Sequence, residues 1–174
     1  MLFKFSQAFP AYVLCLTAFT FSPQVDAKVK NAKSVLNVHK CSKLDTKENL
    51  LACAMYAESR NQGKKGMTAV GNVVLNRVNN PSFPKTIRGV LYQQGQFSYT
   101  YQGAFKAEDQ QSWVEAKQIA SQLIYLNQNF PEARDAIDIT QGATYFKKRT
   151  THAFWAKDMK LVFRYKGHQF FRED

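Results

Sequence analysis

The chain has 174 residues and is strongly basic, with 24 lysines and arginines against 13 acidic residues and a formal net charge of +11. Such a balance favours acidic polymers or surfaces as partners. Nucleic acid is the usual candidate, but the sequence contains no nucleic-acid recognition motif. It also has no internal repeat, no low-complexity segment and no phosphate-binding glycine loop, so we expect no cofactor.

Residues 1–27 have the pattern of a secretory signal peptide. Lys4 precedes the apolar run AYVLCLTAFTF, and Val25-Asp26-Ala27 is a small-x-small cleavage pattern. The apolar run is shorter than the roughly 18 residues that span a bilayer, so we expect cleavage rather than a stable membrane anchor. The protein would then be exported, to the periplasm or outside the cell, and the remaining chain has the size of one domain. This export also argues against a nucleic-acid partner.

A lysine-rich stretch without acidic residues follows at 28–44, which predicts an exposed basic N-terminal arm before a folded domain of residues 45–174. Two cysteines remain after signal cleavage, Cys41 and Cys53. An even count in an exported chain predicts a disulfide, worth about 3 kcal/mol by loop entropy. The alternative is a metal site that adds His39, but the spacing matches no standard zinc pattern, so we expect no metal.

Glu58 is the candidate for acid chemistry. Asp45 and Glu48 form a capping-box signature, which predicts a helix over residues 46–59 with Glu58 in its last turn. Helical spacing places this carboxylate on an apolar stripe with Leu51, Ala54 and Met55. Burial there raises the pKa of the carboxyl group toward the range of a general acid, and the negative end of the helix dipole acts in the same direction. The alternative is an ion pair with Arg60, Lys64 or Arg77 that ties down the helix end.

Further helices are predicted by apolar spacing. They cover 67–78, 85–92 and 109–127, with a shorter piece after Pro131; the stripe of the third is Trp113, Ala116, Ala120, Leu123, Ile124 and Asn127. Gly71 lowers helix propensity, so we expect it to mark a close helix crossing. For Asn76 and Arg77 we expect C-terminal capping roles in their helix; the alternative is that either side chain points into the cleft. The tail LVFRYKGHQFF predicts a β-hairpin that turns at Lys166-Gly167.

Three sequence blocks, AMYAESRNQGKKGMTAVGNVVLNRV, PSFPKTIRGVLYQQGQFS and DITQGATYF, together resemble the cell-wall hydrolase family of the spore-cortex-lytic (SleB/CwlJ) type. The resemblance covers residues 50–145, and a weaker match to the family follows at GHQFF near the end of the chain. It implies a lysozyme-like, lytic-transglycosylase-like single domain of mostly helical α+β class that cleaves the glycan strands of peptidoglycan. It also implies that Glu58, in the first block, is the catalytic acid and that residues 45–174 form a catalytic domain.

We assign Gln96, Phe97, Ser98 and Tyr145 to substrate binding. Sugars present hydroxyl groups at their edges and C–H groups on their faces, so a sugar site needs amide groups beside aromatic rings. Gln96, Phe97 and Tyr99 offer both, and Tyr145 can supply a hydroxyl group. Without the family resemblance, a surface turn with one buried phenylalanine would be the favoured interpretation of residues 93–99.

Asp138 and His168 are the other titratable residues in the family blocks. Asp138 is a possible second carboxylate, although a role in an Asx-type turn fits it better. For His168 a structural role with a bond to the backbone is favoured, because glycan cleavage by an acidic glutamate does not require imidazole.

The leading hypothesis is a secreted, monomeric enzyme that cuts the β-1,4 bond between N-acetylmuramic acid and N-acetylglucosamine, with Glu58 as general acid and base. Because residues 59–98 contain no carboxylate, a lytic transglycosylase that forms 1,6-anhydro-muramyl ends is favoured. The alternatives are a hydrolytic muramidase that uses Asp138, a non-catalytic peptidoglycan-binding domain, and a basic exported nucleic-acid-binding protein.

Overall fold

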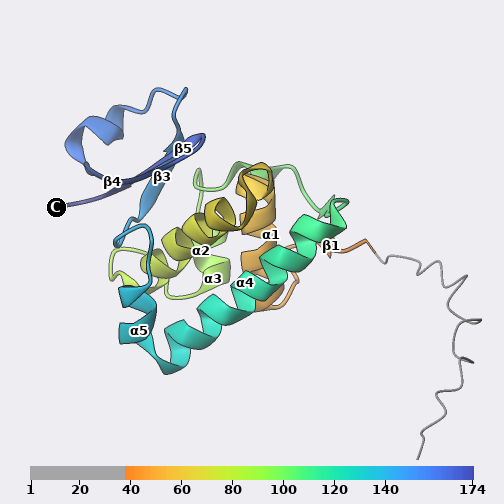
Figure 1. Ribbon diagram of the computed structural model, residues 1–174. Coiled ribbons are helices and arrows are strands. Elements are labelled where there is room, and N and C mark those ends of the chain that lie inside the picture. Colours follow the sequence, from red (N-terminus) through yellow and green to blue (C-terminus); the bar gives the residue numbers. More distant parts are fainter. Residues whose placement is uncertain (1–37) are drawn as a thin grey trace, which may run out of the picture. The chain divides into compact units, whose positions relative to one another are not determined.

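The structure, a computed structural model, describes residues 38–174 (Figure 1). The expected signal peptide and most of the expected basic arm lie outside the described residues. In chain order the elements are β1 (Lys40–Cys41), α1 (Lys47–Ser59), the 3-10 helix η1 (Arg60–Gln62), α2 (Gly63–Asn79), α3 (Ile87–Leu91), η2 (Ser98–Tyr101), β2 (Phe105–Lys106), α4 (Gln110–Asn129), α5 (Pro131–Ala136), β3 (Tyr145–Lys148), η3 (Phe154–Asp158), β4 (Lys160–Tyr165) and β5 (His168–Arg172).

The main hydrophobic core lies where α1, α2 and α4 pack against one another. Leu51, Ala54 and Met55 on α1 have no exposed surface, as their predicted stripe requires. A side chain at Gly71 would place its Cβ 2.8 Å from Cδ1 of Leu123, so the predicted close crossing is confirmed. The predicted apolar stripe of α4 is buried from Trp113 to Ile124.

The N-cap of α1 and the start of α2 differ from the predictions, and the ends of α3 and α4 differ by one or two residues. The N-cap of α1 is Thr46, whose hydroxyl accepts from the amide of Asn49, and not Asp45. The Asp45 carboxylate instead accepts from the amide of Ser42, which closes the preceding turn. Helix α2 begins at Gly63, earlier than expected, and directly follows η1.

The C-terminal part of the chain forms a three-stranded antiparallel sheet in the order β3-β5-β4. The predicted hairpin is confirmed as β4 and β5, and Lys166 at its turn has a positive φ of 44°. One face of the sheet packs on α2 through a second, smaller core of Ala69, Val73, Ala143 and Phe170. This packing carries the β4–β5 turn to the side of α2 on which α1 ends (Figure 1).

A disulfide joins Cys41 and Cys53, as predicted, and ties β1 to α1. Both thiols are therefore occupied, and the alternative metal site of His39 with the two cysteines is wrong. Lys40 and Cys41, which fall inside the expected arm, pair with β2 as an antiparallel strand, so the end of the arm is part of the fold. Among the described helices, none is both long and apolar enough to cross a bilayer.

Candidate active site

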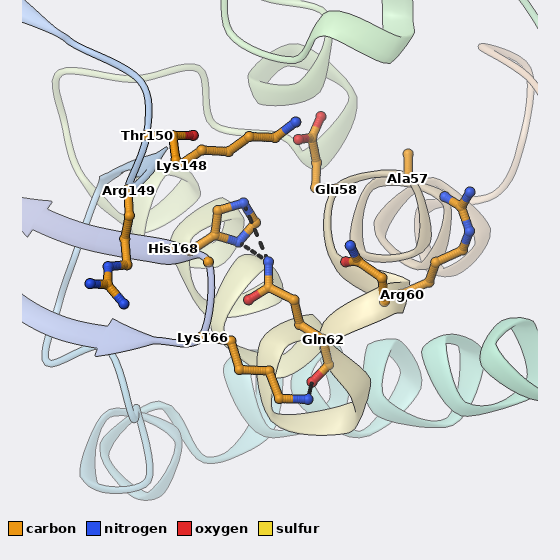
Figure 2. A pocket seen from close by; sticks show the side chains of 11 residues that line it. Ala57, Glu58, Arg60, Gln62, Lys148, Arg149, Thr150, Lys166 and His168 are labelled. Carbon is orange, nitrogen blue, oxygen red and sulfur yellow. Dashed lines mark hydrogen bonds between the residues drawn. The ribbon is translucent and has the colours of Figure 1, made fainter.

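The pocket that contains Glu58 has a volume of about 690 Å³ (Figure 2). One wall comes from the end of α1 and η1, and the opposite wall from the end of β3 and the β4–β5 turn. Its lining residues are Ala57, Glu58, Arg60, Asn61, Gln62, Lys148, Arg149, Thr150, Lys166, Gly167 and His168. Glu58 is the only carboxylate among them.

Glu58 lies in the last turn of α1, half-buried, with its carboxylate at the pocket. Burial raises the pKa of this carboxyl group, and the nearby Lys148 ammonium opposes the rise. Figure 2 shows the Lys148 side chain extended toward the Glu58 carboxylate. Burial has the larger effect, so the environment favours the protonated acid that a glycosidase needs.

The ion pairs considered as an alternative role for Glu58 are not formed. No salt bridge in residues 38–174 includes Glu58; Lys64 pairs with Glu115 at 3.7 Å instead. The Arg77 guanidinium donates through Nε to the carbonyl of Thr144 at 2.6 Å. A half-buried carboxylate without an ion-pair partner, facing a pocket, has the surroundings of a functional group rather than of a structural one.

Gln62 and His168 join the two walls of the pocket. Nε2 of Gln62 lies 2.7 Å from Nδ1 of His168, and both side chains are buried. The Lys166 ammonium donates to the carbonyl of Gln62 at 3.0 Å, which adds a second link to the hairpin turn. The partner of His168 is therefore a side chain, and not the backbone group that was expected.

Gly66 makes room for this arrangement. It lies one helical turn after Gln62, and a Cβ at Gly66 would fall 2.5 Å from Cβ of Gln62. Any larger residue would force Gln62 or the backbone beside it to shift, which would disturb the contact with His168. The glycine therefore sets the position of Gln62 through close packing rather than through an unusual backbone angle.

Asp138 lies outside the pocket of Glu58. Its Oδ1 accepts from the amide and the hydroxyl of Thr140 at 2.8 and 2.6 Å. Its Oδ2 accepts from Asn76 Nδ2 and from the amide of Gly142, both at 2.9 Å. The carboxylate is buried and fully used in shaping the turn before β3, which agrees with the Asx-type role.

Asn76 and Arg77 do not cap their helix through their side chains, so that expectation is wrong. Asn76 reaches across to Asp138 and to the carbonyl of Ala143, at 2.9 and 2.8 Å. The guanidinium of Arg77 lies over three aromatic rings, those of Phe83, Phe97 and Tyr145, at 5.2 to 5.6 Å from their centroids. Burial lowers the pKa of Arg77 to about 10, so it remains a cation at neutral pH.

The four residues assigned to substrate binding are not in the lining of this pocket. Phe97 has no exposed surface and packs against Tyr99 and Phe146, so its ring face is not open to a sugar as the structure stands. Gln96 is half-buried and Ser98 is exposed, both beside η2. Tyr145 is half-buried, and its hydroxyl donates to Glu173 at 3.2 Å.

Sequence reasoning missed most of the residues around Glu58. Lys148, Arg149 and Lys166 lie in segments where the sequence offers only ordinary surface lysines and arginines. Gln62 follows Glu58 closely in the chain, but nothing local marks it as the partner of a histidine 106 positions away. The available signal was the GHQFF match, which places His168 and the hairpin turn in a family block.

The sequence profile of the family described as Cell Wall Hydrolase matches residues 61–171, well over half of the chain. The chain belongs to the cell wall hydrolase family. The match begins just after Glu58, so it does not itself include this residue. It does include Gln62, the end of β3 and the β4–β5 turn, which supply most of the pocket lining.

This cell wall hydrolase is similar to curated spore cortex-lytic enzymes. It is 28% identical over 127 residues to that of Halalkalibacterium halodurans, covering 72% of this chain and 34% of the relative. It is 34% identical over 67 residues to that of Bacillus subtilis, covering 38% of this chain and 22% of the relative. The chain thus spans about a third or less of the length of these relatives.

Two solved structures share the fold. The catalytic domain of the Bacillus cereus SleB protein aligns with a TM-score of 0.55 and 27% identity, over 72% of this chain and 89% of that domain. The catalytic domain of the germination-specific lytic transglycosylase SleB from Bacillus anthracis aligns with a TM-score of 0.54 and 26% identity, over 72% and 93%. The predicted class, a mostly helical α+β fold of lysozyme-like type, is confirmed.

Proposed function

We propose that this cell wall hydrolase cleaves peptidoglycan glycan strands between N-acetylmuramic acid and N-acetylglucosamine, with Glu58 as general acid and base. The observation that carries the proposal is the position of Glu58, a half-buried carboxyl group with a raised pKa and the only carboxylate of its pocket. Membership of the family and the likeness to spore cortex-lytic enzymes support the substrate class.

In the first step the protonated Glu58 donates its proton to the glycosidic oxygen as the bond from that oxygen to the muramyl C1 breaks. Positive charge develops at C1 and on the ring oxygen. General acid catalysis of this kind contributes about 10²- to 10⁴-fold to the rate. Lys148 stabilises the carboxylate that remains, because its ammonium is the nearby cation that lowers the pKa of Glu58.

In the second step we propose that the C6 hydroxyl oxygen of the same muramyl residue attacks C1, and that the Glu58 carboxylate takes the hydroxyl proton. This forms a 1,6-anhydro-muramyl end and regenerates the acid. Enzymes that use water commonly place a second carboxylate about 5 to 5.5 Å or more from the first. Asp138, the candidate for that role, is committed to four hydrogen bonds outside the pocket. The lytic-transglycosylase assignment rests on this arrangement.

The test is digestion of purified peptidoglycan in water enriched in heavy oxygen, followed by mass analysis of the fragments. We expect anhydro ends that are one water lighter than hydrolytic ends and that carry no label. Reducing muramyl ends with incorporated label would replace the transglycosylase step by hydrolysis. Intact glycan strands would refute the enzymatic proposal and favour a wall-binding domain.

A further inference from the structure

The pocket of Glu58 is surrounded by positive charge. Arg60 extends from η1, Lys148 from the end of β3, Arg149 from the following loop and Lys166 from the β4–β5 turn. We call these four side chains the basic rim. Figure 2 shows them on separate sides of the opening, so they do not converge on one point.

The basic rim has few acidic neighbours in the described part of the chain: the Asp109 carboxylate interacts electrostatically with Arg60, and Glu58 with Lys148. Within residues 38–174 the salt bridges involve other cations, and the only carboxylate in the pocket, Glu58, has a raised pKa. Arg60 lies over the ring of Tyr56 at 4.9 Å, and Lys166 uses one donor on the carbonyl of Gln62. Gathering four cations that form no salt bridge is unfavourable by itself, and a bound anion would offset the repulsion.

The same pocket also contains an unused acceptor. Among residues 38–174, Oε1 of Gln62 finds no hydrogen-bond partner, and the residue is only 7% exposed. Buried polar atoms are rarely left unpaired, so an unpaired one beside a pocket points to a ligand donor. Amide N–H groups are the matching donors, and a peptide carries them together with carboxylates.

We propose that the basic rim binds the carboxylates of the stem peptides that branch from the glycan strand, with Gln62 Oε1 available to an amide N–H. The inference rests on the proposed function and adds a specificity: strands with ionised stem peptides are preferred over strands without that charge. Charges spread around the opening suit peptides that leave an extended polymer at several points. They suit a single compact anion less well.

The experiment compares two substrates made from one preparation. Peptidoglycan is first treated with hydrogen fluoride to remove phosphate-containing wall polymers, and half of it is then amidated with carbodiimide and ammonia to neutralise its carboxylates. We expect the wild-type enzyme to cleave the amidated half with a KM about three- to tenfold higher and a nearly unchanged kcat. Rim contacts act on binding, and their effect should shrink as salt is added.

The matched variants are Arg60→Gln with Arg149→Gln, and Lys117→Gln on the exposed side of α4 as a control. The double variant should raise KM on the charged substrate and match the wild type on the amidated one. Equal KM values for the wild type on both substrates would overturn the inference while leaving glycan cleavage intact. An equal rise in KM for the double variant on both substrates would also overturn the inference. If neither substrate is cleaved, the proposed function fails. Co-sedimentation of the protein with the two preparations then still tests the basic rim, because equal binding to both would refute the proposed role of the rim.

Discussion

Nε2 of Gln62 lies 2.7 Å from Nδ1 of His168, and this contact joins the segment after α1 to the first residue of β5. The two residues flank the pocket of Glu58 from opposite walls. Both are buried, so removing either partner leaves the other with an unsatisfied polar group. Together with the Lys166–Gln62 hydrogen bond and the packing of the sheet on α2, this contact helps to set the distance between the two walls of the pocket.

A double-mutant cycle tests this contact. Gln62→Leu and His168→Phe should each lower the free energy of unfolding by about 1 to 3 kcal/mol, because each strands a buried polar group. The double variant should cost less than the sum of the two, since no stranded partner remains. Chemical denaturation measures all four proteins. Strictly additive losses would contradict a direct interaction.

Glu58→Gln should reduce glycan cleavage by about 10²-fold or more, since the amide cannot donate the acid proton. The same change should stabilise the fold at neutral pH. Burial raises the pKa of Glu58, so the folded state binds more protons than the unfolded state between pH 4.5 and the raised pKa, and stability falls as pH rises through that window. Glutamine carries no charge, so it removes the loss of stability that comes from burying the ionised carboxylate.

The control for this variant is Glu108→Gln, an exposed carboxylate outside the pocket. It should leave both activity and stability unchanged. A Glu58→Gln protein that keeps most of its activity would show that another group is the acid. Equal stability of Glu58→Gln and the wild type at neutral pH would show that burial of the Glu58 carboxylate does not destabilise the folded protein.

Lys148→Met should move the alkaline limb of the pH–activity profile to higher pH. The Lys148 ammonium lowers the pKa of Glu58, so without it the acid stays protonated to a higher pH. Arg60, Arg149, Lys166 and His168 also line the pocket and remain in this variant. The pKa of His168 is lowered by burial and by Lys148, so a rise in its pKa is also expected.

The measurement is the initial rate against pH for the wild type, Lys148→Met and Lys117→Met. Lys117 lies on an exposed part of α4 and should leave the profile in place. A shift of the alkaline limb to lower pH in Lys148→Met would have the wrong sign and would contradict the electrostatic role given to this lysine.

Asp138→Asn tests whether Asp138 has a structural role or is a second catalytic carboxylate. The amide would present a donor where the carboxylate accepts from four donors, so we expect a loss of about 1 to 3 kcal/mol in the free energy of unfolding. Activity per folded molecule should stay within about twofold of the wild type. If activity instead falls about 10²-fold in a fully folded sample, Asp138 is the second carboxylate and water is the nucleophile.

Replacing Cys41 and Cys53 by serine should lower the free energy of unfolding by about 3 kcal/mol, because the disulfide limits the unfolded chain. Activity at low temperature should persist, since neither residue lines the pocket of Glu58. Thermal unfolding with and without reductant provides the comparison. Free-thiol titration of the denatured, unreduced protein should find no reactive thiol in the mature chain.

Signal cleavage at residue 27, export, the monomeric state and the absence of nucleic-acid binding stay predictions. The signal peptide lies outside the described residues. Mass measurement of the mature protein, fractionation of the producing cell and sedimentation of the purified chain test these expectations separately.

Local patterns were enough to predict the helices, the hairpin, the disulfide and the place of Glu58 on an apolar stripe. Each of these depends on spacing within a short stretch of chain, on helix or strand period, or on a count of cysteines. The close helix crossing at Gly71 could also be predicted, because a residue that disfavours the helix is kept inside one where the packing needs a small side chain. The resemblance then supplied the chemical class.

The tertiary structure alone decided which residues stand around Glu58. Lys148, Lys166 and His168 reach the pocket because the β3-β5-β4 sheet packs on α2, and sequence distance conceals that contact. It also decided that Phe97 is buried beneath Arg77, and that Asn76 and Asp138 bond to each other. A local pattern reports the face on which a side chain lies, whereas its partner depends on how distant elements pack.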